Sequence, residues 1–202
     1  TREQIQVFSF GVFLLSALVS GALVALAEEV LFRGVVPEVI RRAFGASSVF
    51  LAGCLSSLAY ACIHVLAAPV GVDVDVTPWS GLGVVLASTA PLGTPSDYWD
   101  SFSALFLLGL GLCIVRYATG SLMWCLGLHA AFVTSIRVFK ELTLRDSFND
   151  YAYLAGGSDH FIGILVAGWL LMLIAAAGVY LSRGQIRSLR PTPLLSRRSD
   201  VT

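Results

Sequence analysis

Two adjacent glutamates and an arginine interrupt a long apolar stretch near the start of the chain. Glu28, Glu29 and Arg33 occur in Glu-Glu-Val-Leu-Phe-Arg, with apolar residues continuing on both sides. An ionisable side chain at membrane depth is costly, so it indicates a functional site. The i, i+4 spacing predicts that Glu29 and Arg33 pair on one helix face. Glu28 lies about 100° around the helix, which leaves its carboxylate facing a different partner. The alternative is that both glutamates are solvated at the membrane interface while Arg33 extends towards water.

Two histidines lie in later apolar stretches. His64 follows Tyr60 by four residues, so both share a helix face, and His129 lies in Gly-Leu-His-Ala-Ala. Taken singly, each histidine is as typical of a structural hydrogen bond, or of a haem or pigment ligand, as of catalysis. Together with the glutamates they form a set that can activate water: a carboxylate base, an imidazole partner and an imidazole that stabilises an oxyanion.

The composition places these residues in a membrane protein. The chain has 202 residues, of which 56% are hydrophobic and only 13% charged, and its mean hydropathy is +0.81. Too few polar residues are present to cover a soluble fold, and a net charge of zero argues against a nucleic-acid partner. No pair of the four cysteines has the close spacing of a metal or redox motif, so neither metal nor cofactor is expected.

Five apolar stretches predict an all-α, polytopic transmembrane helix bundle. Each approaches or reaches the roughly 20 residues needed to cross a bilayer, and they cover residues 7–27, 47–68, 102–115, 122–138 and 161–181. The first continues beyond Glu29, and its expected ends are Pro37 and Gly45. Ala17, Gly21 and Ala25 recur every fourth position on the face that leads to Glu29, so we expect that face to pack against another helix.

Charge and composition divide the chain and orient it. Residues 1–183 form the predicted membrane core, which includes a Gly/Pro-rich acidic loop at 68–101 with a short re-entrant piece near 82–87; residues 184–202 form an Arg-rich tail. Arginines follow the first and last apolar stretches, whereas the loop is acidic. The positive-inside rule therefore places the tail on the cytoplasmic, stromal or matrix side of a bacterial inner or organellar membrane.

The order of these motifs resembles the CAAX prenyl protease 2 family, also called the CPBP or ABI family of intramembrane glutamic endopeptidases. The similarity covers residues 7–181 and rests on Glu-Glu-x-x-x-Arg, on aromatic-x-x-x-His and on a histidine in a later helix. It implies that Glu28 activates the attacking water and that Glu29 and Arg33 hold the local geometry. It further implies that His64 supports the carboxylate and the water, and that His129 stabilises the oxyanion. The implied substrate is a membrane-tethered peptide or prenylated protein, cleaved among membrane lipids without metal or cofactor.

Two positions depart from the family pattern. The family commonly has Asn four residues after the third-motif histidine, whereas this chain has Val133, and Tyr60 stands where Phe is more usual. An aliphatic side chain cannot donate to an oxyanion, and loss of one such donor typically costs about 10² to 10³ in rate. Either another group such as Trp124 or a backbone amide substitutes, or the chain is a slow peptidase. The alternative function is that of an inactive or repurposed member, an accessory or assembly subunit of a larger membrane complex.

Overall fold

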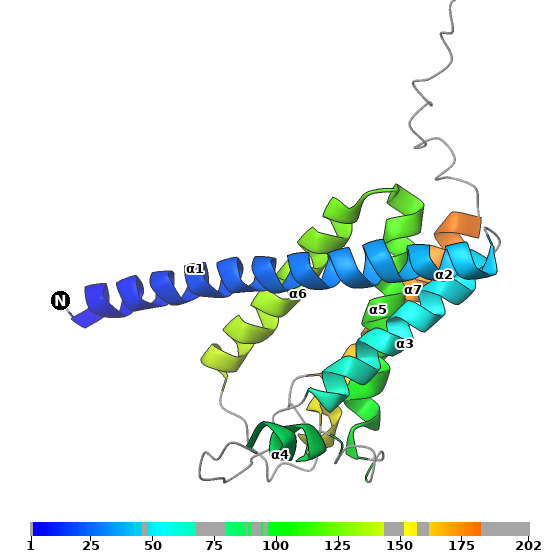
Figure 1. Ribbon diagram of the computed structural model, residues 1–202. Coiled ribbons are helices and arrows are strands. Elements are labelled where there is room, and N and C mark those ends of the chain that lie inside the picture. Colours follow the sequence, from blue (N-terminus) through cyan, green and yellow to red (C-terminus); the bar gives the residue numbers. More distant parts are fainter. Residues whose placement is uncertain are drawn as a thin grey trace, which may run out of the picture.

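The computed structural model describes residues 2–45, 48–67, 80–87, 89, 94, 97–143, 152–156 and 162–182. All regular elements in these ranges are helical, which confirms the all-α prediction (Figure 1). They are α1 (Arg2–Glu29), η1 (Val30–Val35), α2 (Val36–Phe44), α3 (Val49–Leu66), α4 (Ser80–Ala87), α5 (Trp99–Thr119), α6 (Leu122–Leu142), η5 (Ala152–Ala155) and α7 (Ile164–Ser182). The tail and most of the acidic loop lie outside the described residues; α4 covers the segment predicted as re-entrant, whose depth in the membrane stays a prediction.

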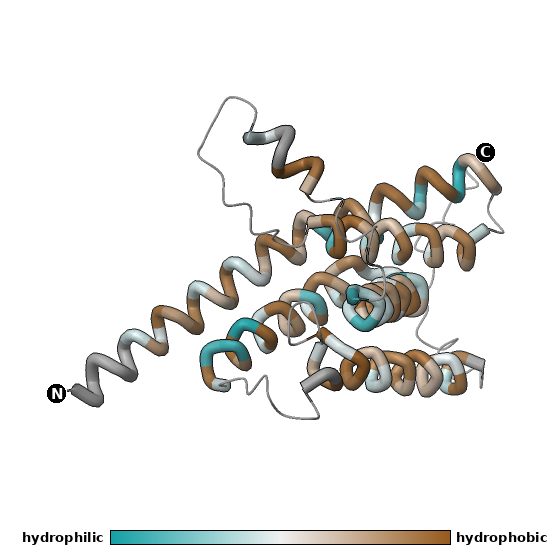
Figure 2. The backbone as a smooth tube through the Cα atoms, turned by 90° about the horizontal axis from the view of Figure 1, so that it is seen from below, coloured by the Kyte–Doolittle hydropathy of each residue, from teal (hydrophilic) through white to brown (hydrophobic). Residues whose placement is uncertain are grey.

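Five helical segments are long and apolar enough to cross a membrane, as the sequence predicts. They are Ser9–Phe44, Val49–Leu66, Trp99–Thr119, Leu122–Leu142 and Ile164–Leu181. Hydrophobic residues run along all of the long helices, and many large apolar side chains are exposed (Figure 2). In water such a surface would be unstable, whereas in a bilayer it contacts lipid tails. The chain is therefore an integral, multi-pass membrane protein.

The first crossing does not end at Pro37, which corrects one of the two predicted ends. Its 36 residues continue through η1, a π-helical turn, into α2, and the crossing stops at Gly45, whose φ is +89°. Pro37 lies in the first turn of α2, where a missing backbone N–H is tolerated. The π turn ends directly before α2, so Pro37 lies in the first turn of a new α-helical segment and does not break the crossing.

The π turn leaves the Phe32 carbonyl without a partner inside its own helix. In an α-helix the N–H of Val36 would donate to Phe32, but here it donates to the Leu31 carbonyl. In a π-helix the donor to Phe32 would be Pro37, which has no N–H. The hydroxyl of Ser56 on α3 donates to the Phe32 carbonyl instead, and both groups are buried. This bond ties the turn that follows the glutamates to α3.

Small residues bring the helices together around this turn. α1 packs against α6, α3 against α5, and α5 also against α6 and α7 (Figure 1). Ala17, Gly21 and Ala25 are buried, and a Cβ added to Gly21 would lie 2.8 Å from Thr134 Oγ1 on α6. The predicted small-residue face is therefore the α1–α6 contact, and it carries Glu29 into the protein interior.

Candidate active site

Glu29 is the most enclosed charged group among the described residues. Its side chain has no exposed surface, and Oε1 lies 3.0 Å from Nη1 of Arg33, whose side chain is 1% exposed. The same oxygen lies 2.6 Å from Nδ1 of His129 on α6. The predicted ion pair is thus buried rather than solvated. Because Glu29 is paired with an arginine, it accepts a hydrogen bond from His129 as a carboxylate.

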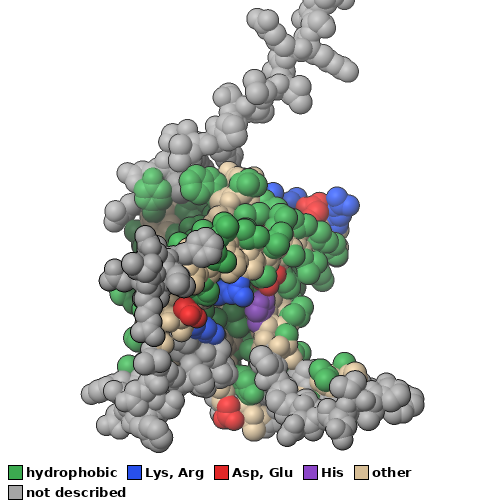
Figure 3. All heavy atoms as spheres, turned by 90° about the vertical axis from the view of Figure 1, so that its left-hand side faces the viewer, with side chains coloured by type: hydrophobic (Ala, Val, Ile, Leu, Met, Phe, Trp, Pro, Cys, Tyr) green, Lys and Arg blue, Asp and Glu red, His purple; other side chains and the backbone are tan. Residues whose placement is uncertain are grey.

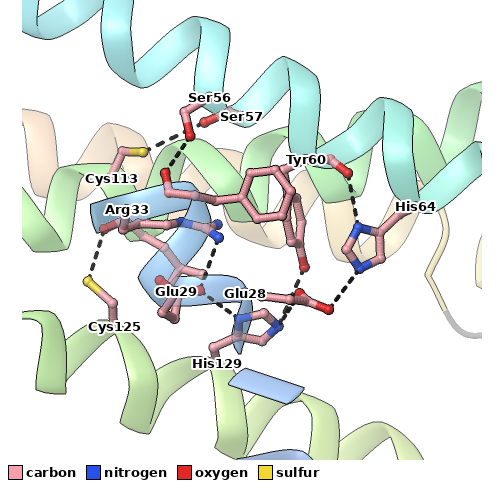
Figure 4. A network of polar contacts seen from close by, with 12 residues as sticks. Glu28, Glu29, Arg33, Ser56, Ser57, Tyr60, His64, Cys113, Cys125 and His129 are labelled. Carbon is pink, nitrogen blue, oxygen red and sulfur yellow. Dashed lines mark hydrogen bonds and ion pairs between the residues drawn. The ribbon is translucent and has the colours of Figure 1, made fainter. Parts of the chain in front are cut away.

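Glu28 turns its carboxylate to a different side and lies between two histidines (Figure 4). Its Oε1 atom lies 3.5 Å from Nε2 of His64 on α3, and its Oε2 atom lies 3.6 Å from Nε2 of His129. The side chain is 22% exposed, in contrast to its neighbour Glu29. Oε2 is buried and accepts no hydrogen bond from the described residues. One oxygen of Glu28 therefore faces each imidazole, in a position to accept a proton from a bound water.

The backbone of α3 orients His64. Nδ1 of His64 lies 2.9 Å from the carbonyl oxygen of Tyr60, one helical turn earlier. A carbonyl oxygen only accepts hydrogen bonds, so Nδ1 carries the hydrogen and Nε2 is directed at Glu28. In the neutral ring this leaves the Nε2 lone pair next to the carboxylate, and a shared water molecule can then donate to both.

Tyr60 lies in the centre of the cluster, although the sequence assigned it no role beyond sharing a face with His64. Its side chain is 1% exposed, and its hydroxyl lies 3.4 Å from Nε2 of His129. The ring meets that of Phe32 edge to face, with centroids 5.2 Å apart, and the guanidinium carbon of Arg33 lies 4.7 Å from its centroid. The signal available in the sequence was a hydroxyl at a position where the resembled family usually has phenylalanine.

A cavity of about 320 Å³ opens on these groups. Its polar lining includes Glu28, Tyr60, His64 and His129, and its walls are largely apolar. Figure 3 shows a histidine at one face of the molecule with acidic and basic side chains beside it, below a broad area of hydrophobic side chains. The Glu28 carboxylate is therefore reached through a cavity with apolar walls.

Val133 lines this cavity, so the position at which the resembled family commonly has Asn opens on the same space as Glu28 and His129. Trp124, which the sequence suggested as a substitute donor, is 63% exposed and is absent from the cavity lining. That suggestion is wrong, because Trp124 lies near the start of α6, more than a helical turn before His129.

The positions of the histidines do not favour the haem or pigment interpretation. Both Nε2 atoms are directed at the Glu28 carboxylate, and Nδ1 of His129 is engaged by Glu29. A macrocycle bound to either Nε2 would have to displace that carboxylate into apolar surroundings. Within the described ranges no group of three or more His, Cys, Asp or Glu side chains is arranged to hold a metal ion.

The comparison with known proteins is consistent with this geometry. Residues 10–135 match the Rce1-like family, described as type II CAAX prenyl endopeptidase Rce1-like. The matched segment is more than half of the chain and contains all five predicted site residues. Neither the curated proteins nor the solved structures contain a match.

Proposed function

The chain belongs to the Rce1-like family of type II CAAX prenyl endopeptidases, and on that premise we propose that it is a metal-independent intramembrane peptidase in which Glu28 activates water. The observation that carries the proposal is the position of the Glu28 carboxylate between the imidazoles of two other helices, at 3.5 and 3.6 Å. A carboxylate within one water molecule of both imidazoles has the reach that a general base requires.

The proposed reaction is a direct attack of water on a peptide bond. Glu28 accepts a proton from the water while Nε2 of His64 accepts a hydrogen bond from the same molecule and orients it. The resulting hydroxide adds to the scissile carbonyl carbon, and negative charge develops on the carbonyl oxygen on the His129 side. When the C–N bond breaks, Glu28 returns its proton to the leaving amine. No covalent intermediate with the protein forms.

Glu29 and Arg33 are positioning residues in this scheme. The ionised Glu29 accepts from Nδ1 of His129 and thereby sets the ring's orientation. Arg33 neutralises Glu29 in a site that no solvent reaches, and it lies over the ring of Tyr60. Both therefore act on the reaction through groups that line the cavity.

The cavity lining supports a lipid-anchored peptide as the substrate. Apolar walls formed by residues such as Leu105, Leu108 and Phe132 suit a hydrophobic chain, and the family's description names prenyl substrates. Arg137 and Lys140 line the same cavity, and the C-terminal carboxylate of a peptide is the complementary group. We therefore expect a peptide whose lipid anchor lies close to its C-terminus.

The arrangement of basic residues supports the proposed orientation. Arg41 at the end of α2 and Arg116 at the end of α5 line one polar pocket, so these two helix ends lie at the same side of the bundle. Five alternating crossings bring the end of α7, and with it the Arg-rich tail, to that side. The positive-inside rule makes it the cytoplasmic, stromal or matrix side.

Val133 supports the second candidate, an inactive or repurposed accessory subunit of a membrane complex. A family member that has lost its catalytic donor keeps its fold and its polar cluster. The two functions are separated by incubating the purified protein in lipid with membrane-tethered and prenylated peptides in ¹⁸O-labelled water. A peptidase releases a product whose new C-terminal carboxylate contains one ¹⁸O atom, whereas an accessory subunit releases none.

A further inference from the structure

The oxyanion of the proposed reaction needs a hydrogen-bond donor that Val133 does not supply. His129 alone meets this need only in its charged form. Its Nδ1 hydrogen is committed to Glu29 at 2.6 Å, so in the neutral ring Nε2 has a lone pair and repels an oxyanion. A second donor, one that is available whether His129 is neutral or charged, therefore has to face the part of the cavity that holds the oxyanion.

We propose that the hydroxyl of Tyr60 is that donor, a catalytic group that replaces the amide side chain missing at position 133. This inference rests on the proposed function. The hydroxyl lies 3.4 Å from Nε2 of His129, and Tyr60 lines the same cavity as Glu28 and Val133. The phenol therefore reaches the side of the cavity where the carbonyl oxygen acquires its charge, without any change in the backbone.

The surroundings of Tyr60 hold its ring in one orientation. Phe32 meets it at an interplanar angle of 84°, and the ring of His64 lies 4.2 Å away, centroid to centroid. A donor that is already aligned before the reaction needs no reorganisation when charge develops. The guanidinium of Arg33 lies 4.7 Å from the ring centroid and draws on its π electrons, which makes the O–H a stronger donor. The ion pair with Glu29 holds Arg33 in place and thus also keeps its guanidinium over the Tyr60 ring.

The hydrogen of the Tyr60 hydroxyl has an acceptor at each stage. Before attack its acceptors are the Nε2 lone pair of neutral His129, 3.4 Å away, and the carboxylate of Glu28. As hydroxide adds to the carbonyl carbon, the carbonyl π pair moves onto oxygen, and the O–H rotates to donate to that oxygen. The tyrosine keeps its proton throughout, because Glu28 takes up the water proton and later delivers it to the leaving amine.

The two departures from the family pattern, Tyr60 and Val133, then compensate for each other. The resembled family commonly has a phenylalanine and an asparagine at these positions, whereas this chain has Tyr60 and Val133, so on this proposal the donor has moved from α6 to α3. An asparagine at position 133 would lie one turn beyond His129 on the same helix face, beside the same cavity. Each combination provides one neutral donor next to the third-motif histidine.

The test is a double-mutant cycle in proteoliposomes with a lipid-anchored peptide substrate. Tyr60→Phe should lower kcat about 10²- to 10³-fold with little change in KM, since an oxyanion donor acts mainly in the transition state. The double variant Tyr60→Phe/Val133→Asn should have a kcat at least tenfold higher than that of Tyr60→Phe alone. Tyr117→Phe removes a tyrosine hydroxyl on α5 outside the cavity lining and should retain wild-type kcat.

A second measurement does not depend on how well Tyr60→Phe folds. Replacing Tyr60 by 3,5-difluorotyrosine keeps the ring and acidifies the phenol, so the donor hydrogen is lost at lower pH. A decrease in kcat caused by loss of this hydrogen should accordingly begin at lower pH than any alkaline decrease in the wild type. Wild-type kcat in Tyr60→Phe, failure of Val133→Asn to restore it, or an unmoved alkaline limb would each overturn the inference while leaving Glu28-dependent cleavage intact. Absence of cleavage by the wild type overturns the proposed function, and this inference with it.

Discussion

Oε1 of Glu29 accepts a 2.6 Å hydrogen bond from Nδ1 of His129, although 100 residues separate the two in the sequence. The bond joins the end of α1 to the middle of α6 and selects one orientation of the imidazole. The two adjacent glutamates therefore have different roles. Glu29 is enclosed and orients the ring of His129, whereas Glu28 faces the cavity. Helical geometry, with about 100° between successive residues, is what separates them.

Replacement of Arg33 by alanine should destabilise the protein strongly. Glu29 would remain charged in a site with no exposed surface, and an uncompensated buried charge costs about 3 to 5 kcal/mol. The measurement is thermal unfolding in a mild detergent. Arg42→Ala removes a largely exposed partner of Glu38 and should leave the melting temperature unchanged. Equal melting temperatures for the two variants would mean that the Glu29–Arg33 pair is solvated.

Ser56→Ala should destabilise the π turn. The Phe32 carbonyl would lose its inter-helix donor and stay buried, at a cost of about 1 to 3 kcal/mol. Ser57→Ala is the matched control, because the Ser57 hydroxyl donates to the Gly53 carbonyl within its own helix. Thermal unfolding of both variants should rank Ser56→Ala clearly below Ser57→Ala. The reverse order would contradict the role given to this bond.

Gly21→Ala should loosen the contact between α1 and α6. The new Cβ would lie 2.8 Å from Thr134 Oγ1 and 3.3 Å from the Ala130 carbonyl oxygen, and such overpacking costs about 1 to 3 kcal/mol. Gly11 lies earlier on α1 with nothing within 4 Å of an added Cβ, so Gly11→Ala should not lower stability. A stable Gly21→Ala variant with normal activity would show that α1 and α6 pack less closely than described.

Val133→Asn should raise kcat in the otherwise unaltered protein. The added amide provides a second donor beside His129, and the gain should be smaller than in the Tyr60→Phe background, where it is the only neutral donor. Val133→Leu adds bulk without a donor and should not raise kcat. The kcat values of the wild type, Val133→Asn and Val133→Leu are compared by steady-state kinetics in the same lipid. A higher kcat in Val133→Leu would mean that packing at position 133, rather than hydrogen bonding, explains the gain.

The sequence predicted the features that follow from helical periodicity and from the cost of charge in lipid. The five crossings, the small-residue face of α1 and the Glu29–Arg33 pair all follow from spacing along one helix. The π turn was not predictable in this way, because apolar residues are compatible with either helix type. Pro37 was the one local signal, and it suggested a helix end, whereas the missing N–H is accommodated by a hydrogen bond from Ser56 on another helix.

The position of Tyr60 shows a second limit. Its spacing from His64 indicated a shared helix face, but the contact of its hydroxyl with His129 depends on how α3 and α6 pack around α5. Trp124 shows the converse, since an indole N–H five residues from His129 in the sequence faces outward in the fold. Which polar atoms meet in a membrane bundle is decided by helix packing, and no periodicity within one helix reports it.

The central claim, that Glu28 is the base of a peptidase, is tested most directly by one comparison of cleavage. Wild type, Glu28→Gln and Glu141→Gln are assayed with the same lipid-anchored peptides in the same vesicles. The variants make the same chemical change, in the cavity and at the exposed end of α6 respectively. We predict cleavage by the wild type and by Glu141→Gln, and none by a folded Glu28→Gln, which keeps the shape of the side chain but cannot accept the proton. Equal cleavage by all three, or none by the wild type across the panel, would contradict the claim.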